Sequence, residues 1–218
     1  MASGKPPSDP AHLPILTAPS AKPEEAPRDV REILDFWFHE NARARWFAST
    51  SAFDQEIRRR FGELYARAAT GALKEWERSA EGCLALCILL DQFPRNIFRG
   101  DARAFATDHK ALAIAERAVA EGFDRRLPAE RKQFLYMPFM HSENLGNQLR
   151  AIALLEAARL DEGRRWARDH LNLIRRFGRF PHRNAVLGRP STPDELAFLE
   201  YSEERFGQAP AKPEAREP

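Results

Sequence analysis

The chain has 218 residues, and its 34 basic side chains nearly cancel its 32 acidic ones, which leaves a formal net charge of +2. This length suits one domain with a full hydrophobic core, and the near balance of charge makes nucleic acid an unlikely partner. The longest apolar run, residues 83–90, is far shorter than the roughly 20 residues that a membrane helix needs. We therefore expect no membrane-spanning segment.

The first residues and the cysteines indicate the compartment. The N-terminal sequence MASGKPPSDP has no apolar core of a secretion signal. Cys83 and Cys87 lie one helical turn apart inside the apolar run, where cysteines more often pack as small hydrophobes than bridge or bind metal. These features predict a reduced, cytoplasmic protein.

The two ends differ in composition from the rest of the chain. Residues 1–27 contain seven prolines and little that could form a core, which predicts a disordered leader. Residues 208–218 repeat this composition and are predicted to be a disordered tail. The folded domain is expected over 28–207.

Hydrophobic spacing predicts four helices in the first part of this domain. They span about 29–39, 51–70, 79–93 and 101–121. Thr50 or Ser51 is a suitable cap for the second helix, and Gly71 ends it. The third helix is apolar on every side, as a buried helix is, and Pro94 is expected to stop it.

Further helices follow in the second part. They span about 128–141, 143–160 and 164–177, and a last one begins at Thr192-Pro193-Asp194-Glu195 with the signature of a capping box. This last helix is expected to turn Leu196, Leu199 and Phe206 inward. No segment alternates with period two for long enough to be a strand. The sequence predicts a single all-α domain of about eight helices in antiparallel hairpins.

Polar side chains interrupt the apolar faces of these helices when each is wound at 100° per residue. They are Asp91 at the end of the third helix, Asp108 on the fourth, His141 on the fifth, Gln148 beside Leu145 and Leu149 on the sixth, and His170 beside Trp166 on the seventh. A buried carboxylate without a partner is costly, so the two aspartates should meet cations or several donors. A shared polar pocket and a purely structural network both remain open.

The stretch after the seventh helix reads RRFGRFPHRNAVLGR over 175–189. Pro181 places His182, Arg183 and Asn184 on a turn, and Arg179 precedes it, so an anion docked there would meet charge-assisted donors. Residues 163–189 contain eight arginines, but those within the helix lie opposite its apolar stripe and are predicted to form a solvated face.

Several motifs of known chemistry are missing. The sequence has no Gly-rich phosphate loop, no paired-Cys zinc spacing and no His-Glu-x-x-His helix. His141, His170 and His182 could meet Glu143 at a metal in a helical hairpin fold, but their spacing does not require it. We therefore assign no metal ligands, and the cofactor is unknown.

Five strings carry a resemblance to a known family. They are DQFPRN at 91–96, FATD at 105–108, YMPFMHSE at 136–143, RFGRFPHRN at 176–184 and LGRPST at 187–192. The chain resembles the bacterial domain-of-unknown-function 924 family over about 30–207. The resemblance implies a TPR-like helical fold and no established activity. The family's motif positions include Arg95 and, among the residues already singled out above, Asp91, Asp108, His141, Glu143, His182, Arg183 and Asn184.

The first functional hypothesis is a site that binds or transforms a small anionic ligand. Its acid/base would be His141 or His182, because a histidine tuned near neutral pH needs a carboxylate partner. That partner would be Asp91, Asp108 or Glu143. The ligand-binding set would be Arg95, Asn96, Gln148, His170, Arg179, Arg183 and Asn184. The hypothesis requires these groups to converge, and Arg183 and His182 lying far from His141 and Asp108 would exclude it.

The second hypothesis is a protein-interaction module. TPR-like hairpins present a concave groove to a peptide or partner protein. In that case the buried polar groups lock helix packing, and the arginines of 164–175 face the partner. The sequence leaves open the ligand, the reaction and the oligomeric state.

Overall fold

The computed structural model describes Met1 and residues 26–201. Apart from Met1, Ala26 and Pro27, the predicted leader over 1–27 lies outside the described residues, as do the predicted tail over 208–218 and Phe206. No residue within 26–201 belongs to a strand, so the prediction of a single all-α domain is confirmed for this part of the chain. The hairpins are compatible with a TPR-like array, and that finer description stays a prediction.

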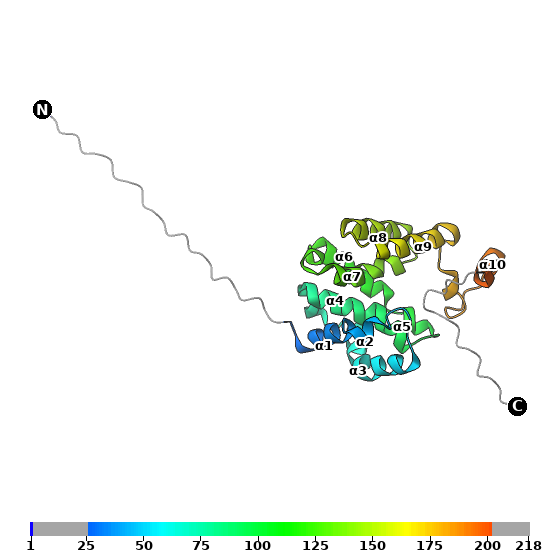
Figure 1. Ribbon diagram of the computed structural model, residues 1–218, viewed down its shortest axis with the longest axis horizontal. Coiled ribbons are helices and arrows are strands. Elements are labelled where there is room, and N and C mark those ends of the chain that lie inside the picture. The colour runs from blue at the N-terminus through cyan, green and yellow to red at the C-terminus, as the bar shows by residue number, and fades with distance from the viewer. Residues whose placement is uncertain (2–25, 202–218) are drawn as a thin grey trace.

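The helices are stacked in layers (Figure 1). The α-helices are α1 (Arg28–Trp37), α2 (Glu40–Arg43), α3 (Ser51–Thr70), α4 (Ala80–Cys87), α5 (Phe93–Ile97), α6 (Asp108–Ala120), α7 (Ala129–His141), α8 (Leu145–Ala157), α9 (Asp161–Phe177) and α10 (Pro193–Tyr201). In Figure 1, α1, α2, α3 and α5 lie on one side, α4 lies in the middle, α6 and α7 follow, and α8 and α9 form the opposite side. The short α10 lies beyond the end of α9.

Short helical turns of other types connect these helices. Four are 3₁₀ turns: η1 (Lys74–Arg78), η3 (Ala102–Phe105), η4 (Phe123–Arg126) and η5 (Pro181–Arg183). One segment, η2 (Ile88–Gln92), is π-helical and joins α4 to α5 without a break. None of the helices in residues 26–201 combines the length and the apolar character needed to cross a bilayer.

One hydrophobic core runs through the layers. All residues of α4 except Glu81 are buried, in agreement with the predicted burial of the third helix. Trp37 of α1 makes edge contacts with Phe93 of α5 and Phe134 of α7, with ring centroids 5.5 and 5.6 Å apart. A second, small cluster of Leu173, Ile174 and Phe180 lies under the turn that follows α9. The shared core accounts for the single domain.

The predicted stop at Pro94 is wrong, because the chain continues from η2 into α5 through this proline. Pro94 has no N–H to give to the carbonyl of Leu90, four residues earlier. That carbonyl instead accepts from the hydroxyl of Thr107 at 2.6 Å, in a buried contact. The lost bond within the helix is therefore replaced by one that fixes the start of α6.

The predicted helix over 101–121 is divided in two. Asp101 caps the 3₁₀ turn η3, and α6 begins at Asp108 after a break at residues 106–107. Asp108 therefore lies in the first helical turn and not in the middle of an apolar stripe. A carboxylate in that position is also favoured by the helix dipole.

Local end signals are confirmed. Thr50 caps α3 by accepting from the N–H of Phe53 at 3.3 Å, and Gly71 ends it with φ of 82°. The capping box at α10 is reciprocal: Glu195 donates its N–H to the Thr192 hydroxyl at 3.3 Å, and the Thr192 N–H donates to the Glu195 carboxylate at 2.7 Å. These signals act within a few residues, so they can be predicted from sequence.

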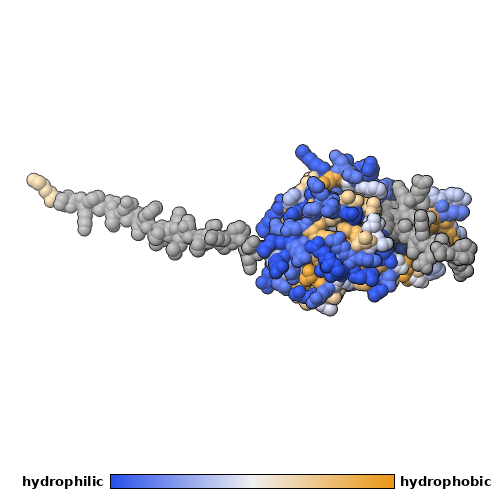
Figure 2. Space-filling view, turned by 60° about the horizontal axis from the view of Figure 1, so that its bottom comes forward, coloured by the Kyte–Doolittle hydropathy of each residue, from blue (hydrophilic) through white to orange (hydrophobic). Residues whose placement is uncertain are grey.

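Some inward predictions are wrong. Leu145, Leu149 and Trp166 are 45%, 46% and 40% exposed, and Leu196 is 57% exposed. The apolar stripe of α8 and α9 is wider than the surface that the neighbouring layer covers, because these helices form the outer layer (Figure 1). The face seen in Figure 2 is mostly hydrophilic, with apolar residues gathered in its middle.

Candidate functional site

Asp91 lies at the centre of the candidate site. It belongs to the π-helical segment η2 and is fully buried. Its carboxylate oxygens lie 2.8 and 2.9 Å from Nδ1 of His141, and 3.2 Å separates one of them from the guanidinium of Arg95. The side-chain amide of Gln92 also donates to it. Burial by itself would raise the pKa of Asp91, but the charge of Arg95 and the contact with His141 hold it down at about 2.

His141 is the last residue of α7, three residues after Pro138, which removes one backbone hydrogen bond from this helix. Burial lowers the pKa of His141 below its ordinary value, against the opposing charge of Asp91. The imidazole is therefore neutral at pH 7. A neutral ring that faces a carboxylate through Nδ1 must donate its proton there, which makes Nε2 an acceptor. The side chain keeps 15% exposure, so the site is not sealed.

Asp108 joins two arginines from distant parts of the chain. Arg95 of α5 donates to both its oxygens at 3.0 Å in a bidentate pair. Arg183 of η5, 75 residues further along the chain, donates to one of them at 3.4 Å. Arg95 also donates to the backbone carbonyl of Asp91. Asp108 thus connects the Asp91–His141 pair with the turn after α9.

Arg183 is an unusual buried cation. Its guanidinium lies between the rings of Phe105 and Phe180, with the central carbon 4.7 and 4.5 Å from the two centroids. Among the described residues its buried Nε has no hydrogen-bond partner. Burial, reinforced by the positive charge of Arg95 and opposed by Asp108, lowers the pKa of Arg183 to about 10. The residue remains charged at neutral pH.

Two further histidines extend the site. The rings of His141 and His170 are 6.0 Å apart, and Phe180 lies 5.5 Å from both His170 and His182. Nδ1 of His170 lies 2.8 Å from the carbonyl of Trp166, which fixes Nδ1 as the protonated nitrogen. Burial, together with repulsion from His141 when that ring is protonated, lowers the pKa of His170 to about 3. Burial, together with the charge of Arg183, lowers the pKa of His182 to about 3.

A second polar network supports the turn that carries Arg183. Glu143 accepts from the N–H of Phe180 at 2.8 Å and from Arg189 at 2.7 and 3.0 Å. Arg189 also donates to the amide oxygen of Asn184 at 3.0 Å. Burial opposes these donors, yet together they lower the pKa of Glu143. This network fixes the turn without direct contact to Asp91.

A buried carboxylate of α10 closes this network. Glu195 is 2% exposed and accepts a bidentate pair from Arg179 at 2.7 and 2.9 Å, and the amide of Asn184 donates to it at 3.3 Å. The hydrogen bonds from Arg179, despite the opposing effect of burial, lower the pKa of Glu195 to about 2. Arg179 is thereby engaged away from Arg95 and Arg183.

The structure brings some of the predicted site residues together and separates others. Asp91, Arg95, Asp108, His141, His170, His182 and Arg183 form one contiguous cluster, which we call the His141 cluster. Glu143, Arg179 and Asn184 belong to the supporting network instead. Asn96 donates to Ser49 and Asp54 at 3.0 and 2.7 Å, and Gln148 donates to the carbonyls of Met140 and Ser142 at 2.6 and 2.7 Å. Of the three arginines in the predicted ligand-binding set, Arg95 and Arg183 therefore share Asp108, whereas Arg179 is paired with Glu195.

The sequence reasoning missed several contributors. Thr107 fixes the start of α6, Gln92 contacts Asp91, and Phe105 supplies one of the rings around Arg183. Glu195 was assigned only as a helix cap, because nothing local links it to Arg179. The family strings contain Gln92 at 91–96, and Phe105 and Thr107 at 105–108, and this is the signal that marked these three residues.

The charges of the His141 cluster balance. The carboxylates of Asp91 and Asp108 offset the guanidiniums of Arg95 and Arg183, and the histidines are neutral at pH 7. Within the part of the chain that the structure describes, no three His, Cys, Asp or Glu side chains are arranged to hold a metal ion. The chemistry that these groups offer is proton transfer at His141 beside two fixed cations.

Comparisons with known proteins identify the family. No curated protein matches the chain. A solved structure, that of a protein of unknown function from Agrobacterium tumefaciens (ATU0120), matches with a TM-score of 0.76 and 40% sequence identity, over 79% of this chain and 97% of that one. Residues 33–203 match the family described as bacterial protein of unknown function (DUF924). The chain therefore belongs to the DUF924 family.

Proposed function

We propose that the His141 cluster is a small-molecule site in which His141 acts as a general base on a ligand whose anionic group lies against Arg183. The observation that carries this proposal is the contact of His141 with the buried carboxylate of Asp91 at 2.8 and 2.9 Å. The carboxylate holds the ring with Nδ1 protonated, so Nε2 can accept a proton from a ligand. The same pairing of an oriented imidazole with a carboxylate serves general bases elsewhere.

The local backbone supports a functional role for these residues. Single π-helical turns occur frequently at functional sites, and η2 places Asp91 in one. Pro138 interrupts the hydrogen bonding of α7 just before His141. Two irregularities that face each other across one carboxylate cost stability, and a purely structural core has little need of them.

Arg183 is the anion-binding residue in this proposal. Its Nε is a buried donor without a partner among the described residues. Asp108 accepts from a terminal nitrogen of the guanidinium, and the contact is long at 3.4 Å. The rings of Phe105 and Phe180 pack against the guanidinium, and the side chain of Arg183 is only 8% exposed. A carboxylate or phosphate oxygen on the ligand would therefore meet a desolvated, correctly oriented cation.

Native mass spectrometry and thermal shift measurements test this proposal. The protein would be titrated with inorganic phosphate, acetate and succinate, together with variants Arg183→Gln and, as a matched control, Arg176→Gln. Arg176 is exposed and stacks on Phe177 at 4.6 Å without touching the cluster. We expect saturable stabilisation by one anion class, weakened about tenfold in Arg183→Gln. Equal stabilisation of both variants by the anion would contradict the assignment of Arg183 as the anion-binding residue.

His141→Gln separates catalysis from binding. Glutamine retains a polar side chain of similar reach but cannot take up a proton at neutral pH. For a ligand found in the titration, we expect Kd to change little while turnover of that ligand, or exchange of its acidic proton with solvent, is lost. Retained turnover in His141→Gln would exclude His141 as the base.

A protein-interaction module is the second candidate, and the exposed apolar side chains of the outer layer favour it. Leu145 and Leu149 lie one turn apart on α8, and Trp166 lies on the adjoining α9. The test is binding of a defined partner to the variants Leu149→Glu and Arg183→Gln. Loss of partner binding in Leu149→Glu, with retention of partner binding in Arg183→Gln, would favour the protein-interaction module over the small-molecule site.

A further inference from the structure

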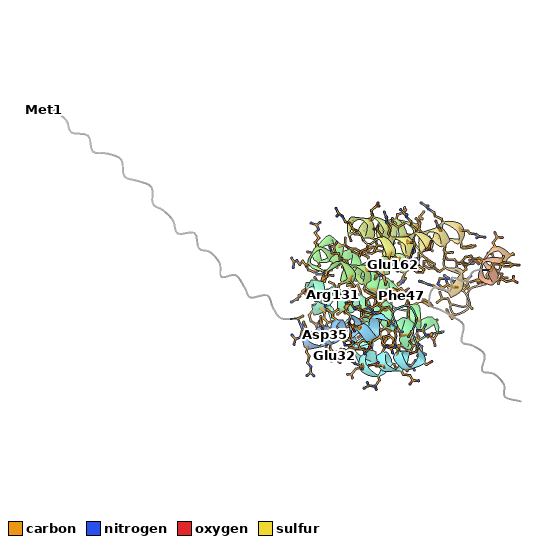
Figure 3. All side chains as sticks on the ribbon, viewed as in Figure 1. Met1, Glu32, Asp35, Phe47, Arg131 and Glu162 are labelled. Atoms are coloured by element: carbon orange, nitrogen blue, oxygen red, sulfur yellow. The ribbon has the colours of Figure 1, made fainter. Side chains whose placement is uncertain are left out.

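A separate pocket lies at the other side of the helical stack. It has a volume of about 540 Å³ and is formed by the end of α1, by α2 and by the first half of α3. This volume is within the range of small-molecule sites. None of its lining residues belongs to the His141 cluster, which is built from η2, α5, α6, α7, α9 and η5. Figure 3 labels Asp35 of this pocket on α1, in the layer opposite to that of Glu162 on α9.

Two aromatic rings form the apolar wall of the pocket. Phe36 and Phe53 are stacked, with ring centroids 5.7 Å apart and planes inclined by 15°. Phe53 is buried and Phe36 is half-buried, so both rings are held by the core while one side borders the cavity. A flat apolar group of a ligand would pack against this wall.

Arg60 also lines the pocket, but carboxylates of the protein already neutralise its charge. It lies 3.2 Å from Glu32 and 3.6 Å from Glu56, and its guanidinium stacks over Phe36 at 4.5 Å. Arg60 and Glu56 therefore neutralise each other within the lining. This pair forms part of the pocket wall and offers no net charge to a ligand.

Among the described residues, Asp35 and Arg45 are the two charged side chains of the lining that take part in no ion pair. Within residues 26–201, the structure gives Asp35 no ion pair or hydrogen bond, and gives Arg45 no carboxylate within 4.0 Å. The guanidinium of Arg45 lies 5.7 Å from the ring centroid of Phe53 and donates to the carbonyl of Asn41. One carboxylate and one guanidinium, neither of them in an ion pair within residues 26–201, thus border the same aromatic wall.

We propose that this pocket binds a small zwitterion with an apolar side chain, an α-amino acid. The ammonium group would pair with Asp35, the carboxylate would pair with Arg45, and the side chain would lie against Phe36 and Phe53. A zwitterion matches a lining in which one charge of each sign is unpaired, whereas a simple anion or cation would leave one of them without a partner. The proposal is independent of the function assigned to the His141 cluster.

L-Phenylalanine is the probe for this pocket, with two analogues that each lack one charge. Phenethylamine lacks the carboxylate, and 3-phenylpropionate lacks the ammonium group. Binding would be measured by calorimetry and by chemical-shift changes on the full chain, with variants Asp35→Asn and Arg45→Gln. Arg59→Gln is the matched control, because Arg59 is exposed on the same α3 and does not line the pocket. All are surface or half-exposed positions, so the variants are expected to fold.

The proposal makes a crossed prediction. We expect L-phenylalanine to bind saturably, each pocket variant to weaken it about tenfold, and Arg59→Gln to leave it unchanged. Asp35→Asn should not affect 3-phenylpropionate, and Arg45→Gln should not affect phenethylamine. Absence of saturable binding, or equal binding by all three variants, would overturn the proposal. Loss of binding in Arg183→Gln would also overturn it, because that would place the ligand in the His141 cluster.

Discussion

Nδ1 of His141 lies 2.8 and 2.9 Å from the two carboxylate oxygens of Asp91, a residue fifty positions earlier in the chain. The pair joins the end of α7 to the π-helical segment η2, in the centre of the stack. Asp91 is fully buried, whereas His141 keeps 15% of its side chain exposed. The carboxylate therefore serves to orient and polarise the ring, and the ring is the member that a ligand can reach.

Asp108→Asn tests the ionic connection between the two arginines. The substitution removes the carboxylate that pairs with Arg95 at 3.0 Å and Arg183 at 3.4 Å, and so leaves two largely buried guanidiniums less well compensated. We expect the free energy of unfolding to fall by about 3 kcal/mol in urea denaturation. Asp101→Asn, which removes an exposed pair with Arg103, is the control and should change it little. Similar results for the two variants would contradict this account.

Stability should fall between pH 7 and pH 5 because of buried histidines. The pKa values of His170 and His182 are lowered to about 3 in the folded protein, so the unfolded chain binds more protons below its ordinary histidine pKa. Each contributes stability that is present above pH 6.5 and is lost as the pH falls, about 2 kcal/mol per histidine between pH 7 and 5. Chemical denaturation at several pH values measures this slope.

His170→Asn and His182→Asn separate these contributions. Each variant should show a shallower dependence of unfolding free energy on pH than the unmodified protein, whatever its absolute stability. The carboxylates do not interfere in this window, because Asp91 and Glu195, with pKa values of about 2, stay ionised. An unchanged slope in both variants would show that these histidines do not titrate as described.

Thr107 replaces the hydrogen bond that Pro94 cannot make. Its hydroxyl donates to the buried carbonyl of Leu90 at 2.6 Å. We expect Thr107→Val to cost about 1–2 kcal/mol, because the carbonyl is left without a partner. In a Pro94→Ala background the new N–H can reach that carbonyl, so the same substitution should cost less. A double-mutant cycle measures the coupling, and strict additivity would exclude the link.

Glu195 holds α10 and the turn before it. Its carboxylate accepts from Arg179 and from the N–H of Thr192 at 2.7 Å. We expect Glu195→Gln to speed amide hydrogen exchange at Thr192 about tenfold, because the charged partner of both donors is lost. Glu200→Gln, an exposed site on the same helix, is the control. Unchanged exchange at Thr192 would show that another contact holds this segment.

Local features of the fold could be predicted from the sequence, and long-range ones could not. The caps at Thr50, Gly71 and Thr192 depend on neighbours within four residues. Helical periodicity places Leu149 on the apolar face of its helix, but it cannot show whether another layer of helices covers that face. In the structure the cover is incomplete, and Leu149 is 46% exposed. The continuation through Pro94 depends on Thr107, which comes from another part of the chain.

The candidate site shows the same division. Asp91, Asp108 and His141 stand out because a polar residue among buried ones needs a partner. Which partner each one finds depends on topology, since the pairs span up to 75 residues. The sequence placed Arg179 with Arg183 because the two are neighbours along the chain, whereas the fold directs Arg179 to Glu195.

The protonation state of His141 tests the central claim most directly. Nitrogen NMR of protein labelled in its imidazole rings reports the tautomer and charge of each histidine, and His141→Gln assigns the signal. At pH 7 we expect a neutral ring with the proton on Nδ1 and an unprotonated Nε2, and Asp91→Asn should shift this signal strongly. An imidazolium at pH 7, or a proton on Nε2, would contradict the role of His141 as a base oriented by Asp91.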